Sequence, residues 1–266
     1  MKINNDNLFE ALKERLRMQL SIEGGQFSPL SDLGPVAEIV AARDVIHQPG
    51  EHCTDLFVVA QGWLIGSSNV RDGGRYIHRI YQPGDLIGAE DVNWNHGTST
   101  VEAVTPAILG RFPKSTLFSL FGSSPALAAA LYGLAMNDLV VAMDAARANA
   151  RLNAPGRIGH LLLQVKARQD ITGPRDTDTV VLPLTQTQIA DALGLTNVSV
   201  SRGLTELTER GLVERTGNAY RLVKPMELAF LSSFTNRYGV DDHAWSRALS
   251  SGLGGKVALP DMPVVL

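Results

Sequence analysis

The sequence predicts an α+β fold, with a β-rich N-terminal half, one long helix and a helical C-terminal third. Three observations support this prediction. Short β-prone runs punctuated by glycines occupy residues 35–112. An Ala- and Leu-rich stretch without internal proline runs from Pro125 to about Leu152. Finally, a Thr-x-x-Gln motif at Thr185 begins two short amphipathic segments joined at Gly194.

Composition limits the classes of protein to consider. The 266 residues, 44% hydrophobic and 19% charged, suffice for two modest domains. The polar start and the lack of an apolar run near the roughly 18 residues of a membrane span predict a cytoplasmic protein with no membrane partner. A single cysteine, Cys53, excludes an internal disulfide and the cysteine sets of zinc fingers and iron-sulfur clusters. The net charge of -3 gives no general attraction to nucleic acid, so DNA binding must rest on a local motif.

The N-terminal half divides into a helical segment, 1–34, and a β domain, 35–124. Apolar residues three and four apart predict a short amphipathic packing helix: Leu8, Phe9, Leu12, Leu16 and Leu20. Runs such as Leu56–Ala60 and Tyr76–Tyr81, separated by glycines, are typical of a small β-sandwich or barrel.

The long helix, 125–152, is predicted to dimerise. Apolar residues alternate at steps of four and three, as in a coiled-coil seam, and the predicted interface consists of Leu127, Leu131, Leu134, Val141 and Ala145. Asp138 interrupts the seam. Either Asp138 faces a ligand or solvent at the interface, or the register of the seam differs by a turn. The alternative is a single helix that lies on its own β domain.

A domain hinge is expected near residues 152–154, because Asn153 is a plausible N-cap and Pro155 follows in the first turn of a new helix. The next domain, 153–224, contains the Thr185–Gln188 capping box, a helix that ends at Gly194, and a second helix capped by Thr196. The predicted core between the two helices consists of Ile189, Leu193, Val200, Leu204 and Leu207. A hairpin turning at 217–218 follows, so the domain is a winged helix-turn-helix.

This motif predicts binding of double-stranded DNA with the second helix in the major groove. Arg202 is the best candidate to recognise guanine, whereas hydroxyl groups suit phosphate contacts. The predicted DNA-contacting residues are Thr185, Thr187, Thr196, Asn197, Val198, Ser199, Ser201 and Arg202. Charge supports this only weakly, since five basic and four acidic residues between 185 and 224 sum to +1. The C-terminal part, 225–266, is predicted to form a helix over 226–234, another over 245–253, and a tail.

The order of these segments resembles the cyclic-AMP receptor and fumarate-nitrate regulator (CRP/FNR) family of bacterial transcription regulators. The motifs that resemble it are Leu56–Gly62, Pro83–Gly88 and Leu184–Leu212. The resemblance implies a β jelly-roll sensor domain like those that bind cyclic nucleotides, and a homodimer whose effector repositions the DNA-binding domains on a palindromic operator. RNA polymerase is a further candidate partner.

The chain departs from the cyclic-AMP binders of that family. Ala89 follows Gly88 where they have a glutamate, and Glu90 is one residue late. In those binders an arginine holds the phosphate, and its position falls here near Gly97, before a Thr-Ser pair, so the phosphate would lose its cationic partner. The candidate effector-binding residues are therefore Gly88, Ala89, Glu90, Thr98, Ser99, Asp138, Ala142 and Met143, with an effector other than cyclic AMP, or none.

Within the recognition helix, Val198 stands where many relatives have a glutamate, which removes an acceptor for cytosine N4 and predicts an altered operator. Gly203 lowers helix propensity at a usually apolar position and is compatible with a close approach to another element.

Three alternatives stay open. Some members of the family bind haem, which makes His47, His52, Cys53 and His78 candidate axial or metal ligands. The spacing of the first three matches no standard zinc signature, so we expect no cofactor and no metal. A catalytic function is not expected, because no phosphate-binding glycine loop, nucleophile elbow or metal-binding His-Glu motif occurs. A cyclic-nucleotide-binding-like module that regulates a protein partner would leave the winged helix unexplained.

Overall fold

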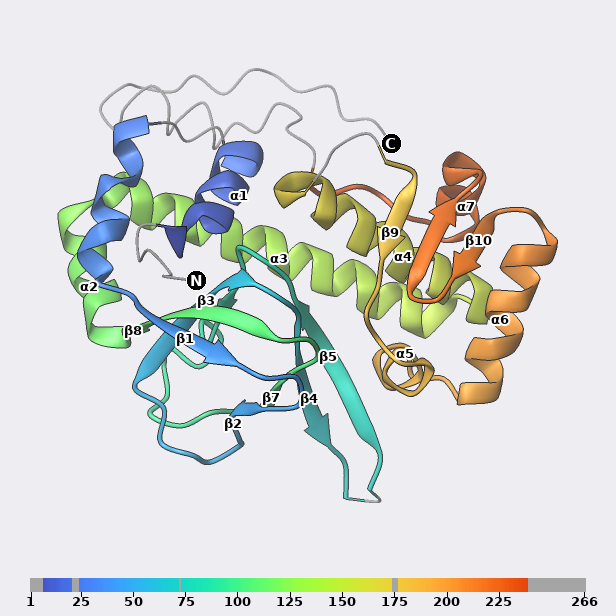
Figure 1. The fold of residues 1–266 in the computed structure, drawn as a ribbon, viewed down its shortest axis with the longest axis horizontal. Coiled ribbons are helices and arrows are strands. Elements are labelled where there is room, and N and C mark those ends of the chain that lie inside the picture. The colour runs from blue at the N-terminus through green and yellow to red at the C-terminus, as the bar shows by residue number, and fades with distance from the viewer. Residues whose placement is uncertain (1–6, 21–23, 72, 174–176, 239–266) are drawn as a thin grey trace.

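The computed structural model describes residues 7–20, 24–71, 73–173 and 177–238. Figure 1 shows a β domain, a C-terminal domain, and a long helix, α3, that runs across the molecule behind both. The helices are α1 (Glu10–Leu20), the 3-10 helix η2 (Gly24–Leu33), α2 (Lys114–Ser123), α3 (Pro125–Arg151), α4 (Ala154–Thr172), α5 (Gln186–Leu193), α6 (Asn197–Glu209) and α7 (Pro225–Leu231). The predicted α+β class is confirmed.

The N-terminal half contains two four-stranded antiparallel sheets. One has the order β1-β8-β3-β6 and the other β2-β7-β4-β5. The strands are β1 (Val36–Val40), β2 (Val45–His47), β3 (Asp55–Gln61), β4 (Leu64–Asn69), β5 (Arg75–Tyr81), β6 (Leu86–Ile87), β7 (Thr100–Ala103) and β8 (Ala107–Pro113). Their inward apolar side chains, such as Val59, Leu64 and Val101, form one core, which is the expected small sandwich.

Helices cover one side of this β domain. Leu12 and Leu16 of α1 share a core with Leu30 of η2 and with Leu127 and Leu131 of α3. The predicted amphipathic helix is thus a packing helix. The sequence did not indicate α2, because its Ser, Thr and Phe residues have low helix propensity and its burial of Leu117 and Leu120 depends on the tertiary fold.

The prediction that the Leu127–Ala145 seam faces a second copy is wrong for this structure. Leu127, Leu131 and Leu134 lie in the chain's own core with α1 and η2, and Val141 packs against α4. Ala145 is half-buried and lines a cavity. The alternative, a helix lying on its own domain, is therefore correct for this face. Heptad spacing shows that one face of a helix is buried but not against what, and here α1 and α4 of the same chain cover that face.

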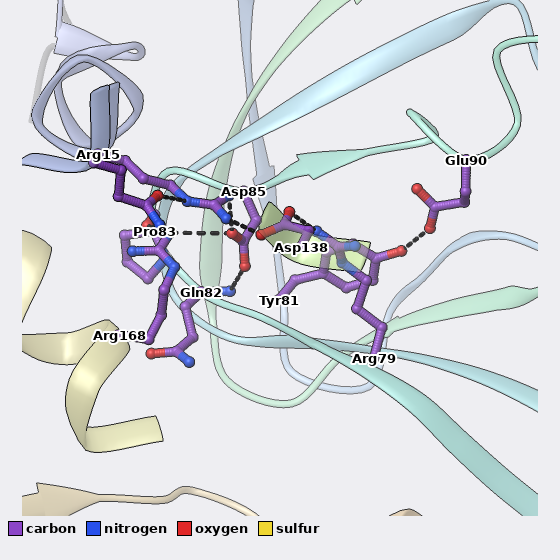
Figure 2. Close-up of polar contacts among 10 residues, drawn as sticks. Arg15, Arg79, Tyr81, Gln82, Pro83, Asp85, Glu90, Asp138 and Arg168 are labelled. Atoms are coloured by element: carbon purple, nitrogen blue, oxygen red, sulfur yellow. Dashed lines mark hydrogen bonds and ion pairs between the residues drawn. The ribbon is translucent and has the colours of Figure 1, made fainter. Parts of the chain in front are cut away.

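Asp138, the polar interruption of the seam, lies in a buried ion-pair network. Its carboxylate accepts from Arg15 of α1 and, at 2.8 Å, from Nη2 of Arg79 on β5. Asp85 accepts from Arg15 at 2.7 Å and from Arg168 of α4 at 3.0 Å. Figure 2 shows these side chains converging from α1, β5, α3 and α4 on the Pro83–Asp85 turn. We call these five residues the Asp85–Asp138 network.

The C-terminal domain is a winged helix. A three-stranded sheet has the order β10-β11-β9, made of β9 (Thr179–Val181), β10 (Val213–Thr216) and β11 (Ala219–Leu222). All five residues predicted for the core between α5 and α6 are buried. Gly203 allows the close approach: a Cβ there would lie 2.7 Å from Cδ1 of Ile158 on α4.

The two domains are in contact. Helix α5 packs on β5, and Nε of Arg75 donates to Asp191 at 2.8 Å. In the C-terminal part, a helix predicted over 226–234 is observed as α7, Pro225–Leu231. The second helix predicted there, over 245–253, and the tail lie outside the described residues.

By length and composition alone, α3 also has the properties of a membrane span, with a mean hydropathy of 1.6 over an 18-residue window of which 22% is buried. The expectation that no segment approaches such a span is therefore wrong for α3. The cause is its many alanines, which add hydropathy without lengthening any unbroken run of large apolar residues.

The free energy of unfolding depends on pH through the ionisation of Asp85. Burial alone would raise the pKa of Asp85, but Arg168, Arg15 and Arg79 outweigh it and lower this pKa from 3.8 to about 2. The contribution of Asp85 is therefore complete above about pH 4 and is lost as the pH falls toward 2. In urea unfolding, Asp85→Asn should lower the free energy of unfolding at pH 7, and the difference from the unaltered chain should shrink by about 2 kcal/mol between pH 4 and 2. Asp44→Asn, at an exposed position, is the control, and a pH-independent difference for Asp85→Asn would contradict this prediction.

Candidate DNA-binding surface and effector site

The turn between α5 and α6 is determined by local chemistry. Oγ1 of Thr185 accepts from the Gln188 amide at 3.2 Å, and Oε1 of Gln188 accepts from the Thr185 amide at 2.9 Å, so the predicted capping box is present. Gly194 ends α5 with φ 61°, which a side chain would oppose. Oγ1 of Thr196 then accepts from the Ser199 amide at 3.1 Å and starts α6.

The predicted DNA-contacting residues form one surface at this turn. Ser199 is half-buried and the other seven are exposed. Nδ2 of Asn197 donates to Oγ1 of Thr187 at 3.3 Å, so the two helices are joined through side chains that lie on this surface. Six of the eight lie at the N-terminal ends of α5 and α6, where backbone N–H groups favour phosphate, and Ser201 and Arg202 lie one turn further along α6.

Ion pairs occupy acidic residues of this domain and leave Arg202 unpaired. Glu206 pairs with Arg210 at 3.5 Å, and Glu214 pairs with Arg221 at 2.6 Å. By contrast, Arg202 has no ion pair or hydrogen bond with any residue in the described part of the chain. Three of the four acidic residues between 185 and 224, Asp191, Glu206 and Glu214, are paired with arginines, whereas Arg202 keeps its charge unpaired among the described residues.

Arg215 on the wing is a further exposed cation beside this surface, and the sequence motif did not indicate it. Its guanidinium lies 5.4 Å from the centroid of the Tyr220 ring, and its Nε donates to the Gly217 carbonyl at 3.0 Å. Arg215 also lines a surface hollow with Gln186 and Thr205, beside the predicted contact Ser201. Arg215 is exposed although strand alternation from buried Val213 would turn it inward, so the sequence pattern gave no signal for it.

The segment that would hold a cyclic-nucleotide phosphate is acidic and internally bonded. Asp91 is fully buried, and its Oδ1 accepts from the Thr98 hydroxyl at 2.5 Å and the Thr98 amide at 3.1 Å. The Glu90 carboxylate bonds the Tyr81 hydroxyl, and burial together with Glu90 raises the pKa of Tyr81. The Lys114 ammonium donates to the carbonyls of Asp91 and Trp94. Here the phosphate of a cyclic nucleotide would meet the carboxylates of Glu90 and Asp91, and the Lys114 ammonium is already bonded to backbone carbonyls.

The candidate effector residues do not form one site. Asp138 and Ala142 line a cavity of about 280 Å³ between β5, α3, α4 and α5. Gly88, Ala89, Glu90, Thr98 and Ser99 lie in the separate acidic segment, and Met143 is 63% exposed on the outer face of α3. The predicted site is therefore wrong as a single pocket, because α3 turns only part of its face toward the β domain.

The histidines and the cysteine do not form a metal cluster. Among the described residues, no group of three His, Cys, Asp or Glu side chains has a metal-binding arrangement. Sγ of buried Cys53 donates to the Asp55 carbonyl, His52 is exposed, and His47 is buried with its nearest carboxylate, Asp91, 4.0 Å away.

Comparison with known proteins finds similarity for both the β domain and the C-terminal domain. Residues 156–231 match the model of a Crp-like helix-turn-helix domain, and residues 38–124 match that of a cyclic nucleotide-binding domain. The chain is 35% identical, over 66% of its length and 70% of the relative's, to the nitrogen fixation regulation protein FixK of Azorhizobium caulinodans. It is 23% identical to the fumarate and nitrate reduction regulatory protein of Salmonella typhi over 71% of this chain and 76% of that protein. The structure of FixK2 from Bradyrhizobium japonicum has the same fold, with a TM-score of 0.68 at 23% identity over 76% of this chain and 98% of that one.

The acidic segment predicts that cyclic AMP does not bind. Titration of millimolar cyclic AMP into the full chain should give no saturable heat and no rise in Tm, because Glu90 and Asp91 repel its phosphate. Cyclic AMP with the purified receptor domain of a known binder serves as the positive control. Saturable binding that disappears in Ala89→Leu would contradict this prediction.

Proposed function

This chain belongs to the CRP/FNR family and is a transcription regulator with a helix-turn-helix DNA-binding domain, and we propose that it acts in the cytoplasm as a homodimer on a palindromic operator. The observation that carries the proposal is the exposed N-terminal end of α6, with Arg202 unpaired among the described residues and hydroxyl groups around it. Its relatives are transcription regulators rather than enzymes.

Support for the homodimer comes from the outer face of α3. This face carries large apolar side chains that remain exposed, at spacings of four, three, one and three along the helix: Tyr132, Met136, Leu139, Val140 and Met143. These steps keep one stripe in register with the 3.6-residue helical period. A second copy of the stripe would cover it, since an isologous contact places the same surface on both subunits.

Sequence recognition is proposed to rest on two residues of α6. Arg202 suits a bidentate contact with O6 and N7 of guanine. Val198, 58% exposed at the first turn of α6, suits contact with the methyl group of thymine. Thr185, Thr187 and Thr196 are proposed to bind phosphates, which fixes the position of α6 on the duplex.

Substitution of Arg202 tests DNA recognition. Arg202→Ala should weaken binding to an operator selected from genomic fragments by about 1–3 kcal/mol, or roughly 5- to 150-fold, while binding to scrambled DNA changes little. Arg210→Ala, at the far end of α6 and paired with Glu206, is the matched control and should retain specificity. If Arg202→Ala kept the full preference for operator over scrambled DNA, the recognition model would be wrong.

Substitution of Leu139 tests the dimer. Leu139 is 51% exposed at the middle of the stripe, so Leu139→Asp should leave the fold intact but place two carboxylates in the interface. Sedimentation in detergent-free buffer should then show monomers where the unaltered chain sediments as a dimer. Phe118→Asp, at a 63% exposed position on α2, is the control, and equal dimerisation of all three proteins would exclude this interface.

A further inference from the structure

The interdomain cavity of about 280 Å³ lies between the two domains rather than inside the β-sandwich. Its walls come from β5 of the N-terminal domain, from α3, and from α4 and α5 of the C-terminal domain. Its volume is near the lower end of ligand pockets, about 300–1,000 Å³, which suits a small metabolite rather than a nucleotide dimer.

The charged groups around this cavity do not balance. The described residues that line it include four guanidinium groups, those of Arg15, Arg79, Arg157 and Arg168, but only two carboxylates, those of Asp85 and Asp138. Burial lowers the pKa of both lining histidines, His78 and His160, which disfavours their charged forms. The described lining therefore has a net charge of +2.

Arg168 contributes to this excess of positive charge. Its side chain is 3% exposed, and its Nη2 donates to Oδ1 of Asp85 at 3.0 Å and to the Pro83 carbonyl at 2.8 Å. Its Nη1 is buried without a hydrogen-bond partner in the described part of the chain. Burial and neighbouring Arg15 lower the pKa of Arg168 despite Asp85, as expected for a cation that lacks sufficient negative charge nearby. A buried N–H without a partner is destabilising, so a hydrogen-bond acceptor placed beside it would be favoured.

Arg157 supplies a second unbalanced cation. Its Nε donates to the Leu152 carbonyl at 2.8 Å and its Nη1 to the Leu193 carbonyl at 3.1 Å, and no carboxylate of a described residue pairs with it. Backbone carbonyls orient the guanidinium without neutralising it. Gln164 and Asn149 add neutral polar groups to the same lining.

We infer that this cavity binds a small anion bearing carboxylate or phosphate groups, with Arg168 as its cationic partner, while Arg157, about 16 Å away along α4, adds to the positive charge of the lining. Guanidinium groups bind both anions in bidentate geometry, so the shared chemistry is an oxyanion. The anion would contact α4 of one domain beside β5 of the other. Its regulatory consequence rests on the proposed function: binding would favour the arrangement of domains seen here over others.

Two probes, inorganic phosphate and succinate, distinguish the two kinds of oxyanion. Each is titrated by calorimetry into the full chain without DNA, at constant ionic strength maintained with chloride. We expect saturable binding of at least one and a rise in Tm, because a ligand that binds only the folded state stabilises it. Failure of both anions to saturate would overturn the inference.

Two variants locate the site. Ala145→Leu fills part of the cavity without removing a charge, and Gln164→Glu adds a carboxylate to its lining with little change of shape. Both should weaken anion binding at least tenfold, and Gln164→Glu should also raise the Tm in the absence of added anion. Ala89→Leu adds the same methyl groups in the acidic segment and should bind like the unaltered chain.

Equal affinity of Ala145→Leu, Gln164→Glu and the unaltered chain would also overturn the inference, and circular dichroism confirms that each variant folds. Because anion binding is measured without DNA, it is separable from operator binding. A chain that binds its operator but no anion would contradict this inference alone, and one that binds an anion but no DNA would contradict the proposed function alone.

Discussion

The burial of Asp85 between arginines from different helices constrains the rest of the structure. An ionised carboxylate in the interior needs partners at short range, and Arg15 of α1 and Arg168 of α4 supply them. The turn that carries Asp85 also approaches α1 closely, since a Cβ on Gly84, at φ 89°, would lie 2.6 Å from the Ala11 carbonyl. Two helices that are distant in sequence are thereby held at one edge of the β domain.

Asp138 extends the same constraint to the long helix. Because it pairs with Arg15 and with Arg79 of β5, this polar residue fixes the rotation of α3 about its axis. The leucines in register with it must then face inward, and Leu139 and Met143 must face outward. The residue that interrupted the heptad pattern thus determines which face of α3 is buried and which stays exposed in this chain.

The helix-turn-helix was predictable because its determinants are close in sequence. The capping box of Thr185 and Gln188, the left-handed Gly194 and the Thr196 cap each act within four residues. The wing followed from the Gly217 turn in the same way. The interdomain cavity was not predictable, because β5, α3 and α4 contribute charged groups from segments separated by dozens of residues, and no periodicity relates them.

By itself, the sequence determined the β-rich half, the long helix, the winged helix and the capped turn between α5 and α6, since these depend on periodicity, capping and turn chemistry over short distances. The tertiary structure alone decided the direction that α3 faces, the division of the candidate effector residues between two places, and the excess positive charge between the domains. Those outcomes depend on how buried charges from separate elements find partners, and local sequence contains no information about such pairings.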